Sequence, residues 1–531
     1  MRLLLAFAGC ALAARLAHTP KANSSAATIP SHAYVQVETD PKGAIWPWRV
    51  FKSSPYTPPN MTITVNQGEL ADGFIFMTPA NINLSAPAAE MDGGFIMTSD
   101  NEAVFALNTS GITDFRVQHY KGQPYLTYWS GYNTEGANVG HGYGQVNFVD
   151  SSYSNFSVNP DLGLNKLVTT PVANWSIDIH EHLVTPWNTL LVSAYNNTPW
   201  DLSPYGGPVD GWIADSLAVE LDIETWEVLF KWVASEHVPL SESQLHINAS
   251  AGIGTIASPW DWFHINAGEM VGSDYLINSR HCWSTYYVSG TNGSVQWRIQ
   301  GVTGGDFGPL PADSTFSWQH YARAHNVTPT GMDLSVFDNH NTIAVNGTPS
   351  NGLVFHLELP PSTSYTPQLL RKIETPSEPI YADSQGDYIV ELSNGNQLLG
   401  YGQIAITREY GPATDGSDLR WQAQFGGLNT VQSYRAFKHV WHATPAAWDP
   451  SLVVESGYAY VSWNGATEVE AWNVYVANST SANGTLVGQA AKEGFETVFE
   501  VPAGAATLQV AAVQKGDEVR RSNTVHIGSV W

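Results

Sequence analysis

Short apolar runs alternate with turn residues along most of the chain, whereas long helical periodicity is nearly absent. From Thr62 onward, runs rich in β-branched and aromatic residues are separated by segments such as N-Q-G, T-P and N-T-S-G. This alternation is typical of strands joined by turns. The pattern therefore predicts an all-β protein, preceded by an extended segment over residues 18–45 that is rich in Ser, Ala, Thr and Pro.

A weak internal repeat runs through the middle of the chain. Four hairpin-like segments carry a similar aromatic or apolar pattern on their second strand, and they span residues 216–232, 284–300, 353–373 and 404–424. Their spacing of roughly 50 to 70 residues is too loose for a solenoid but suits the blades of a β-propeller with long loops. We therefore expect a propeller domain over residues 46–448.

Polar residues stand ahead of the strand that precedes each of these hairpins. His180, His264 and His320 occupy that place in three cases, and Asp383 and Gln385 occupy it in the fourth. The inner strands of propeller blades run alongside one central channel, so residues at the same end of successive inner strands converge. The pattern predicts that the three histidines meet at one mouth of this channel.

Residues able to carry chemistry are densest over positions 259–340. This stretch holds five of the 17 histidines, namely His264, His281, His320, His325 and His340. It also holds Arg280, in a chain with only 23 Lys plus Arg and a formal net charge of -25. That charge argues against nucleic acid or an anionic membrane as a partner, and an anionic substrate would need a local cationic pocket. We expect Arg280 to supply it beside the histidines.

The pattern changes after Pro445. Residues 452–527 read as seven short strands, and one of them carries Trp463. Short strands about ten residues apart with a strand-borne Trp suggest a small β-sandwich similar to fibronectin type III or immunoglobulin modules. We place the boundary near Asp449-Pro450 and expect a separate sandwich domain over residues 450–531.

The beginning of the chain predicts secretion. Residues 1–17 place one basic residue ahead of a short apolar run and then small residues, as in a secretory signal peptide, although an ordinary N-terminal helix is the alternative. No later run is apolar for long enough to span a bilayer. N-x-S/T sequons favour a secreted, extracellular glycoprotein. The thirteen sequons begin at Asn23, Asn60, Asn83, Asn108, Asn155, Asn174, Asn196, Asn248, Asn292, Asn326, Asn346, Asn478 and Asn483.

Several short motifs follow one another in a set order. They are I-H-E at 179–181, D-W-F-H-I-N at 261–266, Y-L-I-N-S-R-H at 275–281, F-S-W-Q-H-Y-A-R at 316–323, F-D-N at 337–339 and S-Y-R at 433–435. Together they resemble the arylsulfotransferase family, in particular its secreted fungal branch, over about residues 34–445. The resemblance implies a six-bladed β-propeller that moves a sulfuryl group from an aryl sulfate to a phenolic acceptor without a nucleotide cofactor. No metal and no other cofactor are expected.

The resemblance also implies roles for single residues. The predicted catalytic residues are His320, His264 and His180, and the predicted substrate-binding residues are Arg280, Asn266 and His281. His320 matches the histidine that becomes transiently sulfated, Arg280 matches the sulfate-binding arginine, and His264 matches a residue that binds sulfuryl oxygens and assists proton transfer. A neutral imidazole is a competent nucleophile near pH 7, and an arginine offers a planar fork of donors to sulfuryl oxygens.

Other interpretations remain open at this point. A non-catalytic propeller that binds phenolic, glycan or sulfated ligands is one, and another aryl-processing enzyme on the same scaffold is a second. The bacterial members have His-His-Asp where this chain has Ile179-His180-Glu181, and they lack the C-terminal domain. Glu181 could accept a proton or lie at a solvated strand end. Cys282, the cysteine left after removal of Cys10, is expected to be a buried structural thiol rather than a nucleophile.

Overall fold

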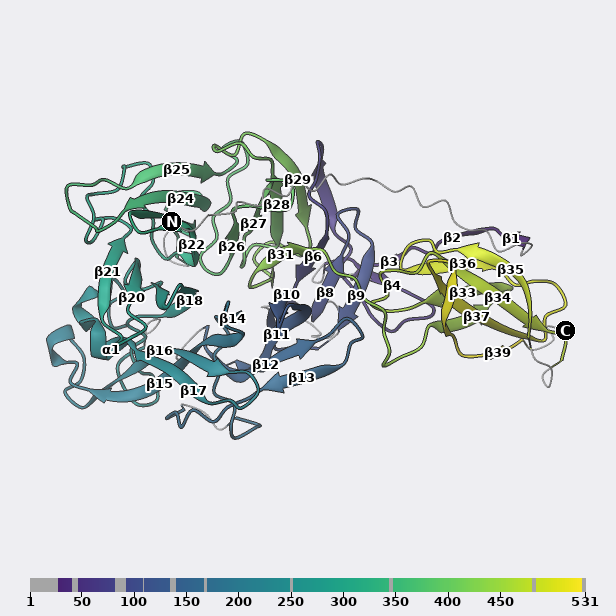
Figure 1. Cartoon of the computed structure of the whole chain (residues 1–531), viewed down its shortest axis with the longest axis horizontal. Coiled ribbons are helices and arrows are strands. Elements are labelled where there is room, and N and C mark those ends of the chain that lie inside the picture. Colours follow the sequence, from purple (N-terminus) through teal and green to yellow (C-terminus); the bar gives the residue numbers. More distant parts are fainter. Residues whose placement is uncertain are drawn as a thin grey trace, which may run out of the picture.

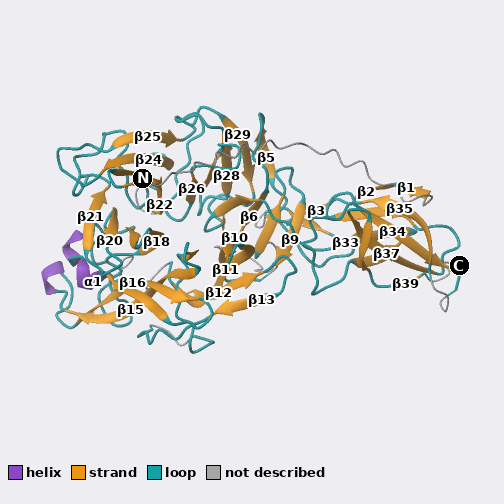
Figure 2. Cartoon of the chain, in the orientation of Figure 1, coloured by secondary structure: helices purple, strands orange, loops and turns teal. Residues whose placement is uncertain are grey.

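The computed structural model describes residues 27–40, 46–81, 92–107, 109–133, 140–166, 170–248, 252–342, 347–479 and 484–527. Strands and loops make up nearly all of them, as Figure 2 shows, which confirms the all-β prediction. The helical elements in these ranges are α1 (Ala234–His237), η1 (Ser203–Tyr205) and η2 (Leu240–Glu242). None of the described helices is long and apolar enough to cross a membrane. The predicted signal peptide lies outside the described residues.

Over the described residues, six antiparallel sheets are arranged around a common centre (Figure 1). Three of them contain β10 (Ile112–Tyr120), β11 (Gln123–Asn133), β12 (Gly142–Val149) and β13 (Asn155–Val158); β14 (His182–Val184), β15 (Thr189–Trp200), β16 (Gly211–Asp222) and β17 (Val228–Val233); and β18 (Ile265–Val271), β19 (Asp274–Ser279), β20 (Ser284–Val288) and β21 (Val295–Gln300). The other three contain β22 (His320–Thr328), β23 (Gly331–Asp338), β24 (Asn351–Glu358) and β25 (Gln368–Ile373); β26 (Asp387–Ile389), β27 (Gln397–Gly400), β28 (Ile406–Tyr410), β29 (Leu419–Gln424) and β5 (Thr62–Asn66); and β31 (Ala436–His439), β6 (Phe74–Met77), β8 (Gly94–Met97) and β9 (Ala103–Leu107).

Strands from early and late parts of the chain pair with each other in the last two sheets of the ring. The early strand β5 pairs with β29, and the late strand β31 pairs with β6. Each pair of neighbouring sheets also shares a buried apolar cluster, because alternate residues of the central strands face the next sheet. Phe76 of β6 and Phe115 of β10 belong to one such cluster, so the last sheet packs against the first.

The first strand of each sheet differs from the strands that follow it. The four hairpins of the internal repeat form the outer strand pairs β16–β17, β20–β21, β24–β25 and β28–β29. The inner strands β14, β18 and β22 were not predicted as strands. Strand β14 has only three residues, and polar residues interrupt the apolar ones in β18 and β22. In Figure 1 the inner strands β10, β14, β18 and β26 lie toward the centre of the ring.

The C-terminal residues form two further sheets beside the ring. One contains β34 (Ala471–Ala477), β35 (Thr485–Ala491), β37 (Thr507–Gln514), β38 (Asp517–Arg521) and β39 (Val525–His526), and the other contains β32 (Ser451–Glu455), β33 (Tyr458–Ser462) and β36 (Glu496–Glu500). The two share an apolar cluster that includes Trp463, Trp472 and Phe499. Strand β38 was not among the seven predicted, because its residues D-E-V-R-R are all exposed on an edge.

The segment predicted to be merely extended takes part in these C-terminal sheets. Strand β1 (Ala27–Ile29) pairs in parallel with β35, and β2 (Ser31–Ala33) pairs with β36. Strand β3 (Gln36–Glu38) then pairs with β4 (Trp48–Val50), while β7 (Ala80–Asn81) pairs with β30 (Val431–Gln432). The prediction of an extended segment over residues 18–45 did not include these pairings, which join its described part to sheets formed more than 400 positions later.

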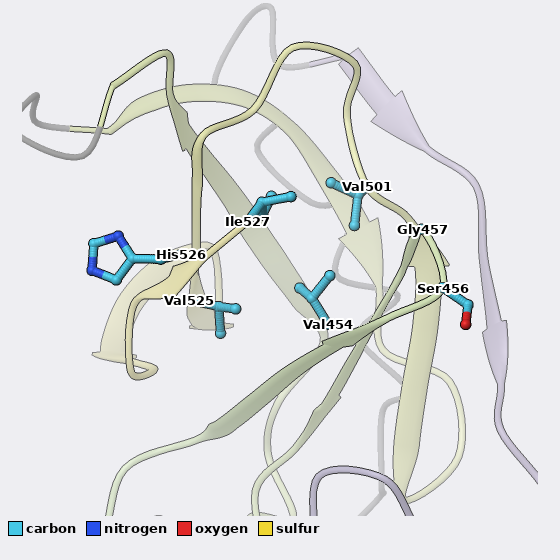
Figure 3. Close-up of a pocket in the computed structure, with 7 residues that line it drawn as sticks. All are labelled: Val454, Ser456, Gly457, Val501, Val525, His526 and Ile527. Carbon is cyan, nitrogen blue, oxygen red and sulfur yellow. The ribbon is translucent and has the colours of Figure 1, made fainter. Parts of the chain in front are cut away.

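A shallow pocket lies on the C-terminal unit, away from the histidines. Figure 3 shows Val454, Val501, Val525 and Ile527 among the side chains that line it. The lining is mainly aliphatic, and the titratable side chain there is that of His526. The residues that line the pocket include no arginine, so the pocket lacks the cationic group that the sequence predicts for a sulfate-binding site.

Candidate active site

His320 lies at the start of β22 and is almost fully buried. Its Nδ1 donates to Asn339 Oδ1 at 2.6 Å, and its Nε2 accepts the backbone N–H of Gln385 at 3.1 Å. The Asn339 amide is fixed in this orientation because its Nδ2 donates to the carbonyls of Ala382 and Gln385. The proton therefore resides on Nδ1, and Nε2 presents a lone pair.

The environment of His320 keeps its imidazole neutral. Burial lowers the pKa of His320 well below its ordinary value, and the nearby positive charge of Arg280 lowers it further. A neutral imidazole with an oriented Nε2 lone pair can act as a nucleophile at neutral pH.

Arg280 lies in the turn after β19, at the same mouth of the ring. Its Nη1 donates to His281 Nε2 at 2.9 Å, and its Nη2 donates to the Asp383 carbonyl at 3.0 Å. Its guanidinium also lies over the ring of Trp318, 5.1 Å from the centroid. Burial lowers the pKa of Arg280 to about 10, so the side chain stays cationic at neutral pH. Its Nε has no hydrogen-bond partner among the described residues.

The loop at 383–385 connects Arg280 with His320. Asp383 supplies the carbonyl that binds the guanidinium, and Gln385 supplies the N–H that binds the imidazole. Gln385 has a φ of 64°, a left-handed conformation that costs a non-glycine residue energy. The sequence analysis had noted both residues as polar positions ahead of a strand, and the structure places them at the site.

Asp261 connects three of the histidines. Its Oδ2 accepts His141 Nε2–H at 2.8 Å and His264 Nδ1–H at 2.6 Å, and its backbone carbonyl accepts His281 Nδ1–H at 2.5 Å. The nearby histidines hold the pKa of Asp261 well below its ordinary value, although burial alone would raise it. The sequence analysis gave Asp261 no role within D-W-F-H-I-N and did not single out His141.

His180 lies in the turn that precedes β14. Its Nδ1 donates to Asp178 Oδ2 at 2.5 Å, and its ring centroid lies 4.6 Å from that of His264. His180 contributes to lowering the pKa of His320, so the two side chains lie near each other. The structure thus gathers His180, His264, His320 and Arg280 at one mouth, the arrangement expected from the strand pattern.

Asn266 and His281 are already engaged with their neighbours. Asn266 Nδ2 donates to the carbonyl of Gln319, the residue before His320, at 2.8 Å, and its Oδ1 accepts from Asn278 at 2.6 Å. Both ring nitrogens of His281 bind protein groups, namely the Asp261 carbonyl and Arg280. These contacts position His320 and Arg280, and direct contact of either side chain with substrate stays a prediction.

A buried cluster of charges forms the floor of this mouth. Arg323 Nη2 donates to Glu181 at 2.7 Å, Arg116 Nη2 at 3.0 Å and Arg435 Nη1 at 3.2 Å, and Arg435 also binds Asp114 at 3.1 Å. Burial alone would raise the pKa of Glu181, but the three guanidinium charges hold it far below its usual range. Both earlier interpretations of Glu181 are therefore wrong, since it is neither solvated nor able to accept a proton near neutral pH.

Strained backbone conformations are concentrated at this site. Sixteen non-glycine residues have positive φ angles over the described part of the chain. Six of them surround the mouth: His264 (58°), Trp283 (50°), Trp318 (57°), Tyr321 (54°), His340 (52°) and Gln385 (64°). Such conformations persist where the surrounding contacts enforce them, and they cluster at functional sites.

The remaining candidates have structural partners. Cys282 is buried, and burial raises the pKa of its thiol to about 12, which confirms the structural interpretation. His325 Nε2 lies 2.9 Å from Ser335 Oγ, and His340 Nδ1 lies 3.4 Å from Asp338.

The H-x-H pair at 180–182 does not form a common ligand set. His180 binds Asp178, whereas His182 lies 3.3 Å from Asp114 on the floor. Ligand atoms of His141, Asp261 and His264 do lie within 4.8 Å of one another. Their spacings of 2.6 and 2.8 Å are those of hydrogen bonds and are shorter than the roughly 3.3 Å between ligands of a tetrahedral zinc ion with 2.0 Å bonds.

Comparison with known proteins identifies one family. The family model described as Arylsulfotransferase (ASST) matches residues 116–426. This range contains Arg280, Asp261 and the site histidines His141, His180, His264, His281 and His320. No curated protein matches the chain. Among solved structures, the chain is similar to one described as the Dos1 propeller, with 14% identity, 78% of this chain and 94% of that chain covered, and a TM-score of 0.30. It is also similar to a protein from Lactobacillus plantarum, with 9% identity, 68% and 98% covered, and a TM-score of 0.30.

Proposed function

The chain belongs to the arylsulfotransferase family, and on that basis we propose that it is a secreted aryl sulfotransferase that works through a sulfohistidine at His320 without a nucleotide cofactor. The observation that carries the proposal is the neutral His320 imidazole, whose Nε2 lone pair is oriented by Asn339 beside the cationic Arg280. A pure binding site has no need of an oriented nucleophile. The donor is an aryl sulfate and the acceptor is a phenol.

We also propose that the six sheets are the blades of a six-bladed β-propeller and that the C-terminal pair of sheets is a β-sandwich. The pairing of β5 with β29, the pairing of β31 with β6 and the apolar clusters between successive sheets support the first assignment. The cluster shared by the two C-terminal sheets supports the second.

In the first half-reaction, Nε2 of His320 attacks the sulfur of the aryl sulfate. The N–S bond forms as the S–O bond to the aryl group breaks, and the aryl oxygen leaves and takes up one proton. Negative charge on the sulfuryl oxygens is stabilised by Arg280, whose Nε–H is unpartnered among the described residues. In the resting site the backbone N–H of Gln385 donates a hydrogen bond to Nε2 of His320; once Nε2 bonds to sulfur, this N–H is free to donate to a sulfuryl oxygen instead.

In the second half-reaction, a phenol oxygen attacks the same sulfur. The O–S bond forms, the N–S bond breaks and its electron pair returns to Nε2, while the phenolic proton passes to a base. We assign this base to His264, because Asp261 fixes its proton on Nδ1 and leaves Nε2 as an acceptor. One proton is consumed in the first half-reaction and one is released in the second, so the cycle balances.

The electrostatics of the site fit an anionic donor. The chain carries a formal net charge of -25, so its overall field repels a sulfate ester. Arg280, which stays cationic near His320, places a positive charge at the mouth itself. This local field attracts the sulfuryl group to the nucleophile.

Rapid-quench mass spectrometry tests the assignment of His320. With an aryl sulfate donor alone, the wild-type protein should release phenol and gain about 80 Da, the mass of one SO₃ unit, on His320. His320→Ala should lose both signals, whereas His264→Ala should form the adduct but transfer it slowly. His325→Gln is a matched control, because His325 contacts Ser335 rather than the site. An adduct on another residue, or an active His320→Ala protein, would refute the proposal; binding without turnover would favour a non-catalytic propeller.

Secretion is part of the proposal and has a structural correlate. All eight sequon asparagines within the described ranges lie at least partly at the surface. Asn155, Asn248, Asn292, Asn326 and Asn478 are the exposed ones. The surface can therefore carry N-glycans without unfolding.

A further inference from the structure

Two histidines from different sheets share one carboxylate oxygen beside the site. His141 lies ahead of β12 in the sheet of β10–β13, whereas Asp261 and His264 lie ahead of β18. His141 Nε2 and His264 Nδ1 are 2.8 and 2.6 Å from the same Oδ2. We propose, building on the proposed function, that Asp261 and His141 are positioning residues that together set the basicity of His264.

The hydrogen bonds define which nitrogen of His264 faces outward. A carboxylate oxygen accepts only, so both imidazoles must donate to it, and a neutral His264 then carries its lone pair on Nε2. The His264 ring lies 4.6 Å from the rings of His180 and His281 and 5.1 Å from that of His141, measured between centroids. The φ of 58° at His264 shows that the backbone is held in a strained conformation to place this ring.

His141 is held firmly in this arrangement. It is buried, and its ring centroid lies 3.9 Å from that of Tyr195. The Tyr195 hydroxyl in turn donates to the backbone carbonyl of Ile265, the residue after His264, at 2.8 Å. The two histidines are therefore connected both through Asp261 and through the packed Tyr195.

Charge is distributed unequally between the two histidines. Burial would lower the pKa of His141, but the carboxylate of Asp261 outweighs it and raises that pKa. Burial lowers the pKa of His264 well below its ordinary value, and Asp261 offsets this only in part. The titratable and charged groups around the pair are Asp261, Asp178, His180, His281, Arg280, Tyr195 and Tyr434.

Because His141 and His264 share the Asp261 carboxylate, the charge of His141 affects the pKa of His264. While His141 is protonated, its charge neutralises much of the Asp261 charge, so the imidazolium form of His264 is poorly stabilised. His264 then stays neutral and can take the phenolic proton in the second half-reaction. That proton is then released to solvent, and the leaving aryl oxygen of the next donor takes up one proton in its turn, so the cycle balances.

Two substitutions should move the pH dependence of transfer in opposite directions. His141→Gln keeps an N–H donor to Asp261 but removes the positive charge. The freed carboxylate then raises the pKa of His264, and the acid limb of the kcat profile moves to higher pH. Asp261→Asn removes the negative charge, so the acid limb moves to lower pH, and kcat falls at every pH because the Nδ1 tautomer is no longer enforced.

The matched control is His325→Gln, which should leave the acid limb of the kcat profile at its wild-type pH. The proposal would be overturned if the acid limb moved in the same direction in His141→Gln and Asp261→Asn, or if it did not move in them. So would near-stoichiometric zinc in the purified wild-type protein that is lost in both variants, because the three side chains would then be metal ligands.

A second measurement does not depend on turnover. Because the folded-state pKa of His141 is raised, its stabilising contribution is fully present below the unfolded pKa of about 6.5 and disappears as the pH rises through the folded value. The gap in melting temperature between wild type and His141→Gln should therefore narrow as the pH rises. Burial lowers the pKa of His325, so the difference in melting temperature between wild type and His325→Gln should instead widen as the pH rises.

This measurement separates the two proposals. An inactive wild-type protein with a narrowing His141 gap would refute the proposed function and leave the paired histidines standing. A gap that is constant or widens with pH would refute the pairing whatever the activity.

Discussion

Glu181→Gln tests the buried charge cluster below the histidines. In the folded protein, Glu181 and Asp114 face Arg116, Arg323 and Arg435, and the side chains of these five residues are at most 8% exposed. Removing one carboxylate leaves three guanidinium groups around a single negative charge. Removing one partner of a buried ion pair costs about 3–5 kcal/mol, a large share of the roughly 5–15 kcal/mol that stabilises a typical domain.

The assay is urea unfolding followed by the fluorescence of the 20 tryptophans. Glu181→Gln should lower the unfolding midpoint strongly with an unchanged m-value. Glu269→Gln is the matched control, because Glu269 accepts the Ala324 N–H at 2.7 Å and burial raises its pKa. Burial already disfavours the charged form of the Glu269 carboxyl, and the amide of Glu269→Gln can still accept the Ala324 N–H. The free energy of unfolding should therefore fall by about 1 kcal/mol or less.

The pH dependence gives a second, signed criterion. The folded-state pKa of Glu181 is depressed, so its contribution is present above the unfolded pKa of about 4.3 and is lost as the pH falls below that value. The difference between wild type and Glu181→Gln should thus be full at pH 7 and shrink in acid. Equal losses for the two variants, or a difference that grows in acid, would refute the reasoning.

Three further outcomes are expected. Arg280→Lys keeps the charge but cannot reach both His281 and the Asp383 carbonyl, so donor turnover should fall by about 100-fold or more, whereas the partly exposed Arg298→Lys should turn over donor normally. Enzymatic deglycosylation of secreted protein should lower its mass by several N-glycans, and an unchanged mass would remove glycosylation from the proposal. A chain ending at residue 449 should be cleaved by protease within 27–40 faster than the full chain, because β1 and β2 lose their partners; equal rates by mass spectrometry would contradict the pairing.

The fold could be predicted from the sequence where strands form continuous runs rich in apolar, β-branched or aromatic residues. The hairpins β16–β17 and β20–β21 have such runs because they are packed between neighbouring sheets. The inner strands β14, β18 and β22 do not, since they carry the polar side chains of the mouth and of its floor. For the same reason the floor residue Glu181 was misjudged: its three arginine partners lie in other sheets, and no local pattern shows them.

The site was predicted only as far as its residues stand in recognisable motifs. His320, His264 and Arg280 were proposed as site residues in this way, and the convergence of the inner strands predicted that they lie near one another. Asp261 stands three positions before His264, but in a loop that spacing does not predict a hydrogen bond between the two side chains. His141 had no local signal at all, because it reaches Asp261 across 120 positions of sequence.

The pairing of the N-terminal strands has a consequence for biosynthesis. Ser31 Oγ donates to the Ala491 carbonyl across 460 positions, and β1 lies alongside β35. At about 5–20 residues per second, a ribosome needs on the order of tens of seconds to make the chain in between. During that time the first strands emerge without partners, while the floor still lacks Arg435 and the ring still lacks β31. The two C-terminal sheets can therefore be completed only after nearly the whole chain has been made, so their assembly follows synthesis rather than accompanying it.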